Sequence, residues 1–367
     1  MNAMLDATPT TGPIALLRED LRDFAGYRSA RSEKLQGHIW LNANESPWAN
    51  PADRDGALRR YPDPQPQQLR EALAALYGCV PEQLLAGRGS DEGIDLLVRA
   101  FCRPGGDAIV VSTPTFGMYA VSARLHGTRV IDVPLREADG EWICDLSAIG
   151  DAAIAQSARI VFLCSPGNPT GALLPLKDIA ALAGRLERRA LVVVDEAYIE
   201  YAGAESAISL IGVQRNIVVL RTLSKAHALA AVRIGSVIGD AELIEALRRC
   251  QAPYPLPVAC VAQALAALDG NAATTTRDRI SAVQAEREGL QRRLASVRGV
   301  RRVYPSRANF VLVRFDDAQD AFERLLSVGV VVRDMRAAQG LGDALRISLG
   351  TPAQNAAVIG ALEGVRA

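Results

Sequence analysis

Lys225 is the residue whose type and position point most directly to chemistry. The 367-residue chain holds 41 lysines and arginines together, and only three of them are lysine, at positions 34, 177 and 225. Since arginine serves wherever only a positive charge is needed, a retained lysine is a candidate for a reaction that needs a neutral amine, such as Schiff-base formation. Lys225 follows the apolar run at 217–220 and has small and hydroxylated neighbours. We therefore expect its amine at the end of a buried strand, whereas Lys34 and Lys177 fit solvated surface positions.

Polar side chains also follow two other apolar runs. Asp195 comes directly after residues 191–194, and Asn168 lies in the turn S-P-G-N-P-T-G after residues 159–164. Because ligands of α/β folds bind at the carboxyl ends of strands, we expect these side chains to meet in one site. A carboxylate at the end of an apolar strand is costly unless it is paired, and a protonated ring nitrogen would pair it. Capping of a following helix is an equally good interpretation of Asp195 alone.

Three further segments favour a bound phosphate. The sequence G-S-D-E-G after residues 84–87 predicts the start of a helix with Ser90 as N-cap, where an anion gains about 0.3–1 kcal/mol from the helix dipole. A capped helix without a ligand is the commoner meaning of such a segment. Ser224 and Arg233 could donate to the same phosphate, although one arginine among so many carries little weight alone. Together with the phenol of Tyr198, these groups are what pyridoxal 5′-phosphate requires.

The order of these motifs carries a family resemblance. The series G-S-D-E, S-P-G-N-P-T-G, V-D-E-A-Y, T-L-S-K-A and R-I-G resembles the fold-type-I aminotransferases, and so do the spacings of 27 residues from Asn168 to Asp195 and 30 from Asp195 to Lys225. The segments L-N-A-N-E, R-Y-P-D and L-R-I-S-L-G-T resemble the histidinol-phosphate aminotransferases in particular. The resemblance extends from about Tyr27 to Thr351, nearly the whole chain.

The resemblance implies a role for each matching residue. Lys225 would form the Schiff base with pyridoxal 5′-phosphate and then move the proton at the substrate Cα. Asp195 would keep the pyridine nitrogen protonated, while Asn168 and Tyr198 would bond to the phenolic oxygen. The other matches are Ser90, Asp91 through its backbone, Ser224 and Arg233 for the cofactor phosphate, Phe116 for stacking on the ring, Tyr61 for the phosphate in the partner subunit, and Tyr27, Asn44, Arg333 and Arg346 for the substrate.

The resemblance also implies a reaction. It is the transfer of the amino group of L-histidinol phosphate to 2-oxoglutarate, which gives imidazole acetol phosphate and L-glutamate in histidine biosynthesis, by a homodimer with shared active sites. Arg346 is the best candidate for the substrate phosphate and, later, a carboxylate of 2-oxoglutarate. An aromatic amino-acid transaminase and a phosphothreonine decarboxylase are alternatives, since they share the cofactor residues. A non-catalytic pyridoxal-phosphate-binding regulator is a third, disfavoured by the short N-terminal segment and the neutral charge.

Three positions depart from the family pattern. Phe116 stands where many relatives carry tyrosine, so a hydroxyl contact is expected to be missing while stacking remains. His227 stands where an aromatic residue is usual, and Ala231 where glycine is usual. We interpret His227 as structural, because Lys225 already supplies the base.

The layout of the chain predicts an α/β fold. Short β-branched runs alternate with amphipathic segments between about residues 65 and 265, which indicates a mostly parallel sheet. After the proline-rich segment 251–257 we expect a long helix at 258–296, strands at 309–315, 328–332 and 344–349, and a last helix from 352. With the resemblance, this predicts an aspartate-aminotransferase-like fold: an N-terminal segment (1–50) packing on the small domain, a large domain (51–257) with a seven-stranded sheet, and a small α+β domain (258–367).

Composition excludes several classes of function. A net charge of zero without basic clusters argues against nucleic acid and membrane-surface partners. Six cysteines without a C-x-x-C pair, and only three histidines, argue against a metal site and fit a cytoplasmic protein. We see no secretion signal, and the apolar runs are far shorter than the roughly 20 residues that span a bilayer.

Overall fold

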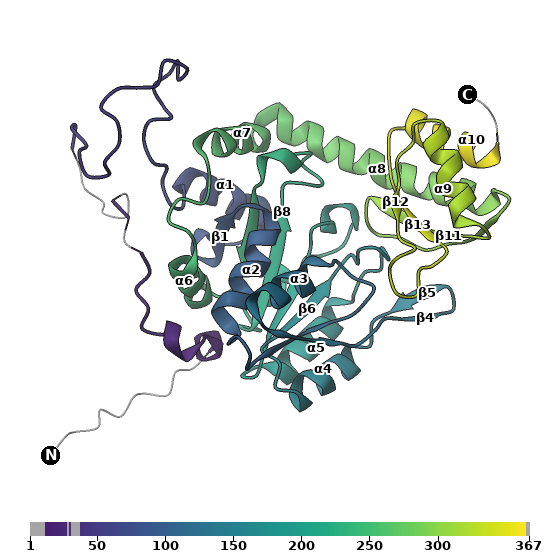
Figure 1. Ribbon diagram of the computed structural model, residues 1–367, viewed down its shortest axis with the longest axis horizontal. Helices are drawn as coiled ribbons and strands as arrows, with labels where there is room; N and C mark the ends of the chain where they lie inside the picture. The colour runs from purple at the N-terminus through teal and green to yellow at the C-terminus, as the bar shows by residue number, and fades with distance from the viewer. Residues whose placement is uncertain (1–11, 28, 31–36, 365–367) are drawn as a thin grey trace.

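A computed structural model describes residues 12–27, 29, 30 and 37–364. Its centre is a seven-stranded sheet in the order β1-β9-β8-β7-β6-β2-β3, with helices on both faces (Figure 1). All of these strands run in one direction except β9, which is antiparallel to both of its neighbours. The mostly parallel sheet is thus confirmed. The strands are β1 (Leu84–Gly87), β2 (Ala108–Val111), β3 (Arg129–Asp132), β6 (Ile160–Cys164), β7 (Leu191–Asp195), β8 (Ile217–Thr222) and β9 (Gly235–Ile238).

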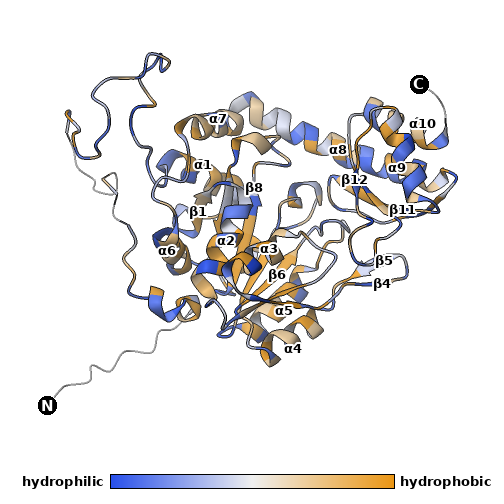
Figure 2. Ribbon diagram, viewed as in Figure 1, coloured by the Kyte–Doolittle hydropathy of each residue, from blue (hydrophilic) through white to orange (hydrophobic). Residues whose placement is uncertain are grey.

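The sheet is apolar on both faces, so it is covered on both (Figure 2). In β7, Val192 and Val194 belong to one hydrophobic core and Leu191 and Val193 to the other, as the two-residue period of a strand dictates. The first core packs against α1 (Gln67–Tyr77), α4 (Leu146–Ala155), α5 (Leu176–Leu186) and α7 (Val258–Leu268). The second packs against α2 (Gly89–Phe101), α3 (Met118–His126) and α6 (Ala241–Cys250).

The C-terminal part has a sheet and a core of its own. Its four strands follow the order β10-β11-β13-β12, and all neighbours are antiparallel. The elements are α8 (Gly270–Ser296), β10 (Val300–Val303), β11 (Phe310–Phe315), α9 (Ala318–Ser327), β12 (Arg333–Asp334), β13 (Ala344–Ser348) and α10 (Pro352–Glu363). This separate core agrees with a small α+β domain, while the boundaries at residues 50 and 257 stay predictions.

Three details of this part differ from expectation. The strand expected at 328–332 is wrong, because Val331 is 79% exposed and only Arg333 and Asp334 pair with β13. The long helix expected at 258–296 is two helices, α7 and α8, separated at Asp269. Strand β10 is not among the expected strands, because its sequence, V-R-R-V, is too short and polar to resemble a buried strand.

Within the described part of the N-terminal segment, residues 14–21 pack on the large sheet, which differs from the expected packing on the small domain. Leu16 and Leu17 are buried in the core beside α2 and α6, and the Arg18 guanidinium donates to the backbone carbonyl of Arg99 in α2. These two apolar side chains anchor the segment to the large sheet instead. Residues 37–61 lie at the opposite end of the molecule from β10–β13 (Figure 1).

A hairpin of β4 (Arg136–Ala138) and β5 (Glu141–Ile143) joins the two parts. Trp142 packs against Tyr304, with ring centres 5.8 Å apart, and Arg314 forms an ion pair of 2.7 Å with Glu137. The hairpin thereby holds one side of the small sheet against the large one.

Candidate active site

One cavity of about 140 Å³ lies where the parallel strands end. In the register of the sheet Cys164 is opposite Asp195, and Asp195 is opposite Leu220, so β6, β7 and β8 end at the same edge. The cavity is lined by Ser90, Asp91, Phe116, Cys164, Asn168, Asp195, Ala197, Tyr198, Thr222, Ser224, Lys225, Ala230 and Arg233. Nine of the ten residues expected to bind the cofactor are in this set, and Tyr61 is the one outside it.

One end of the cavity is built to receive an anion. Helix α2 begins at Gly89 with Arg88 as N-cap and without a side-chain cap, so the expectation that Ser90 caps it is wrong. The N–H groups of the first turn are therefore available to a ligand. Gly89 has a φ of +78°, and a Cβ there would lie 2.5 Å from Nη2 of Arg233. Arg233 itself holds a left-handed φ of 58°, which brings its guanidinium to the start of the helix.

The Arg233 guanidinium is held by three contacts, one of which is the hydrogen bond of 3.0 Å that Nη1 donates to the backbone carbonyl of Ala230. Nη1 donates to Ser224 Oγ at 3.4 Å, and Nη2 donates to the Asp91 carboxylate at 3.1 Å. Ser224 is fixed in turn by Thr222, whose hydroxyl donates to it at 3.0 Å. Because Asp91 turns its carboxylate toward the arginine, its backbone N–H is the group that can serve an anion. Arginine and serine together offer the fork of donors that phosphate favours.

Asp195 is the buried carboxylate of the site, with 2% of its surface exposed. Its Oδ2 accepts from the Tyr119 hydroxyl at 2.7 Å and its Oδ1 from the Ala197 N–H at 3.1 Å. Burial raises the pKa of Asp195 to about 6, and these two hydrogen bonds oppose that rise. The following 3-10 helix has Tyr198 as N-cap, so Asp195 is not a helix cap. A buried carboxylate of this kind calls for a cationic partner in the cavity.

Lys225 enters from the turn after β8, and its Nζ lies 5.7 Å from the centre of the Tyr198 ring. Desolvation lowers the pKa of the Lys225 amine, and the nearby charge of Arg346 lowers it further, against the opposing carboxylates of Asp91 and Asp195. The surroundings therefore shift the protonation equilibrium of Lys225 toward the neutral amine, which is the form that acts as a nucleophile or a base.

A second group of donors lies on the small-domain side. Arg346 donates through Nη1 to Asn168 Oδ1, and Asn168 donates to the Tyr198 hydroxyl through a long contact of 3.4 Å. The guanidinium packs over Phe310 at 5.1 Å, and its buried Nε has no hydrogen-bond partner among the described residues. Arg333 is paired with Arg346 in the β12–β13 register. Two neighbouring arginines with a free donor form a receptor for an anionic group beside the cavity.

The model of the family described as aminotransferase class I and II matches residues 30–362. The chain belongs to this family. A histidinol-phosphate aminotransferase of Xanthomonas euvesicatoria pv. vesicatoria (strain 85-10) is 60% identical over 350 residues, which cover 95% of this chain and 96% of the relative. One from Xylella fastidiosa (strain 9a5c) is 57% identical over 98% of both chains.

A solved structure agrees with this aminotransferase in fold. The histidinol-phosphate aminotransferase from Sinorhizobium meliloti in complex with pyridoxal-5′-phosphate has a TM-score of 0.75 and 27% identity, and the match covers 100% of this chain and 97% of that chain. The fold is therefore the type I fold of the pyridoxal-phosphate-dependent aminotransferases, as expected. The residues present fit that cofactor, since they supply an amine, a buried carboxylate and an uncapped helix start with an arginine.

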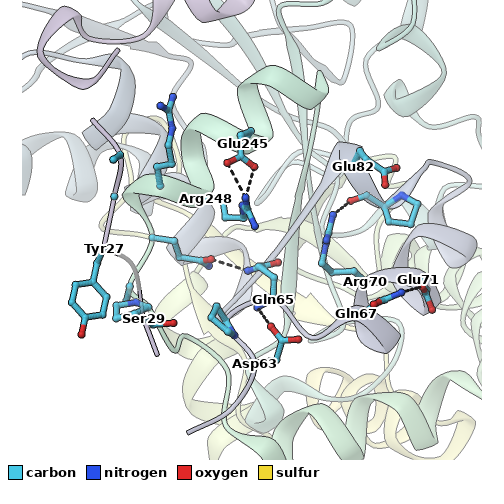
Figure 3. A pocket seen from close by; sticks show the side chains of 18 residues that line it. Tyr27, Ser29, Asp63, Gln65, Gln67, Arg70, Glu71, Glu82, Glu245 and Arg248 are labelled. Atoms are coloured by element: carbon cyan, nitrogen blue, oxygen red, sulfur yellow. Dashed lines mark hydrogen bonds and ion pairs between the residues drawn. The ribbon is translucent and has the colours of Figure 1, made fainter. Parts of the chain in front are cut away.

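Besides Arg333 and Arg346, which lie beside the cavity, three expected site residues are absent from the cavity lining of their own chain. Tyr61 is 49% exposed and stacks on Tyr254, with ring centres 4.4 Å apart. Asn44 is exposed, and Tyr27 lines a different cavity between the N-terminal segment, α1 and α6 (Figure 3). The roles of these three residues stay predictions, and each requires a second copy of the aminotransferase or a movement of the segment that carries it.

The cavity beside Tyr27 is larger, at about 730 Å³, but several of its charged groups are already engaged. Arg70 donates to the backbone carbonyl of Pro81, and Arg248 pairs with Glu245 at 2.8 Å (Figure 3). Its lining contains none of the polar residues that follow β6, β7 and β8. Volume alone therefore does not identify the active site of this aminotransferase.

The remaining expectations concern residues outside the reaction. Lys177 is exposed, as predicted, while Lys34 lies outside the described residues. His227 does not line the cavity. Burial lowers its pKa, with Glu200 and Arg221 as its charged neighbours, which agrees with a structural role. Across residues 12–27, 29, 30 and 37–364 there is no group of three potential metal ligands. Within the same ranges no helix is long and apolar enough to cross a membrane.

Proposed function

We propose that this aminotransferase transfers the amino group of L-histidinol phosphate to 2-oxoglutarate, giving imidazole acetol phosphate and L-glutamate, as a step of histidine biosynthesis. Relatives that carry the name of this activity are 57–60% identical over at least 95% of the chain. The structural observation that carries the proposal is Arg346, which faces Asn168 with an unbonded, buried Nε. It can hold the phosphate of the amino donor and, in the second half-reaction, a carboxylate of the oxo acid.

Pyridoxal 5′-phosphate, when bound, supplies an aldehyde that exchanges amino groups and a ring that accepts the electron pair released at the substrate Cα. Arg233, Ser224 and the first turn of α2 would hold its phosphate. Asp195 would keep a proton on the ring nitrogen, because the buried carboxylate is stabilised by a neighbouring cation. Phe116 lines the cavity and can pack against the ring.

We assign to Lys225 the removal and return of the proton at the substrate Cα. Its amine would first attach the cofactor and then, once the substrate amine replaces it, act as the base that removes and returns this proton. The lowered pKa of Lys225 makes the neutral amine that both tasks need more accessible than in an exposed lysine. Asn168 and Tyr198 would donate hydrogen bonds to the phenolic oxygen of the cofactor, and Arg346 would fix the substrate so that its Cα faces Lys225.

The proposal includes a homodimer with shared active sites. Ten of the eleven residues of α7 are apolar, yet only Ala264 is buried, and Ile39, Leu41 and Trp48 are exposed on the N-terminal segment. Such apolar surface is typical of a protein–protein interface. Tyr61, exposed in the single chain, would then serve the cofactor phosphate of the partner subunit. The six free cysteines support a cytoplasmic location.

The absorption spectrum of the purified protein tests the function. We expect a visible-edge band that disappears on adding L-histidinol phosphate and returns on adding 2-oxoglutarate. Lys225→Ala should reduce turnover by at least about 10²–10⁴-fold, the usual contribution of a positioned general base. A band that responds to phenylalanine but not to histidinol phosphate would indicate aromatic transamination. Release of CO₂ from phosphothreonine would indicate the decarboxylase, and a band that ignores all three would indicate a regulator.

A further inference from the structure

Tyr119 is a buried residue that contacts Asp195 but does not line the cavity. Its hydroxyl donates to Asp195 Oδ2 at 2.7 Å, and the only other hydrogen bond to this carboxylate within the described ranges comes from the Ala197 backbone. The two donors occupy one lone pair on each oxygen. The rest of the carboxylate remains free to face the cavity, which Asp195 lines.

The aromatic ring of Tyr119 is fixed on two sides. It is fully buried near the start of α3 and stacks on Phe162 with ring centres 4.8 Å apart and planes 6° from parallel. Phe116 meets it edge-on at 5.7 Å. Since a stacked, buried ring cannot turn away without losing its packing, the hydroxyl points at Asp195 in a fixed direction.

The hydroxyl acts as a donor at every working pH. Burial and the neighbouring Asp195 charge raise the pKa of Tyr119 well above its ordinary value, so the phenol keeps its proton. A hydrogen bond donated to a carboxylate stabilises the ionised form. Burial works in the opposite direction and favours the neutral acid. Tyr119 is therefore the side chain that decides how firmly Asp195 holds its negative charge.

We propose that Tyr119 is a positioning residue for the reaction. Its O–H orients the Asp195 carboxylate. Asp195 shares a proton with the ring nitrogen of the cofactor, and the hydrogen bond from Tyr119 keeps that proton on the nitrogen. The inference rests on the cofactor assignment of the proposed function. No proton is gained or lost in this arrangement. Without the hydroxyl the shared proton moves toward the carboxylate, and the ring becomes a weaker electron acceptor.

Tyr119→Phe removes the hydroxyl and leaves the packing of the ring. The matched control is Tyr77→Phe, because Tyr77 is also a buried tyrosine and its hydroxyl has no hydrogen-bond partner in the part of the chain that the structure describes. The measurement is the ¹⁵N chemical shift of the ring nitrogen in the protein loaded with ¹⁵N-labelled pyridoxal 5′-phosphate, together with kcat and KM for histidinol phosphate.

We expect Tyr119→Phe to move the ¹⁵N shift toward the value of a neutral pyridine. It should lower kcat about tenfold, the size of one hydrogen bond to a charged group, with KM changed by less than about twofold. Tyr77→Phe should leave the ¹⁵N shift and kcat as in the wild type. An unchanged ¹⁵N shift in Tyr119→Phe would overturn the inference even if kcat fell, because a purely structural role would not act through this proton.

A double mutant tests whether Tyr119 acts through Asp195. In an Asp195→Asn background, Tyr119→Phe should change neither the ¹⁵N shift nor kcat further, since the interaction is already lost. Equal effects of Tyr119→Phe in both backgrounds would overturn the inference. If the wild type gave no ring-nitrogen signal from bound cofactor, the proposed function itself would fail. If the wild type gives a pyridinium signal and Tyr119→Phe leaves this signal unchanged, only the proposed role of Tyr119 is contradicted.

Discussion

At the scale of single residues, Asp195 is a site residue that destabilises the cofactor-free protein. Burial raises its pKa from an ordinary value of 3.8 to about 6. One pKa unit corresponds to about 1.4 kcal/mol, so the ionised form costs about 3 kcal/mol in the folded state. A cation in the cavity would remove this cost, and the site is therefore arranged for a ligand that brings a positive charge.

This cost predicts a pH dependence for the cofactor-free protein. Because the folded state binds its proton more tightly than the unfolded state, the free energy of unfolding should fall as pH rises from about 4 to about 6, and then stay level with respect to Asp195. Asp195→Asn should be more stable than the wild type at pH 8 by up to about 3 kcal/mol, while binding the cofactor more weakly. Urea unfolding at several pH values measures both. A less stable Asp195→Asn at pH 8 would contradict the argument.

The three central residues of the site, which the sequence predicts without the family resemblance, share their position at strand ends. Asn168, Asp195 and Lys225 each follow an apolar run, and parallel strands bring such ends together. Tyr119 carries no such signal, because it lies inside a helix and acts through Asp195. The spacing of Tyr119 and Phe116 on the segment after β2 could have suggested a shared aromatic wall, but not the hydrogen bond. Tertiary contacts decide that bond.

At the scale of elements, Arg221 ties two segments of the site together. It is the fifth residue of β8, and it pairs with Glu196 at 3.4 Å and with Glu200 at 2.8 Å, on the loop after β7. It is 7% exposed and packs over the Tyr77 ring at 4.5 Å. The loop that carries Asp195 and Tyr198 is thereby attached to the strand that leads to Lys225.

We expect Arg221→Met to destabilise the protein by about 3–5 kcal/mol, because the buried carboxylate of Glu196 and the half-buried one of Glu200 lose their common partner. Arg215→Met is the matched control. Arg215 also pairs with two carboxylates, Asp240 and Glu242, but it is exposed, so its loss should cost less than about 1 kcal/mol. Urea unfolding curves of both variants give the comparison. Equal losses would show that Arg221 is no more than another surface ion pair.

The elements that the sequence failed to predict were those without a clear apolar period. The hairpin β4–β5 carries Asp139-Gly140 at its turn, with φ values of 52° and 81°, and this dipeptide was an available hairpin signal. The run V-V-V at 330–332 leads to the wrong prediction of a strand at 328–332. An apolar triplet resembles a buried strand, but Val331 is exposed. The long parallel-sheet strands were predictable because burial on both faces leaves only apolar residues in them.

At the scale of the whole molecule, the single chain exposes two apolar surfaces to solvent. The apolar face of α7 lies beside the 3-10 helix at Ala230–Val232, next to the cavity, and residues 37–61 extend away from the large sheet (Figures 1 and 2). A second copy that covers both would bury apolar surface and bring Tyr61 to the site of its partner. Dimerisation and catalysis would then depend on one another.

Mixing two inactive variants tests this arrangement. Lys225→Ala lacks the amine, and Tyr61→Ala should lose much of its cofactor affinity, so each alone should be nearly inactive at low cofactor concentration. In a mixed dimer, the site that contains Lys225 would receive Tyr61 from the other subunit, and one of its two sites would be complete. Random exchange of subunits should therefore restore about a quarter of the sites. No recovery of turnover after exchange, despite a mixed dimer seen in native mass spectrometry, would mean that Tyr61 acts within its own chain or not at all.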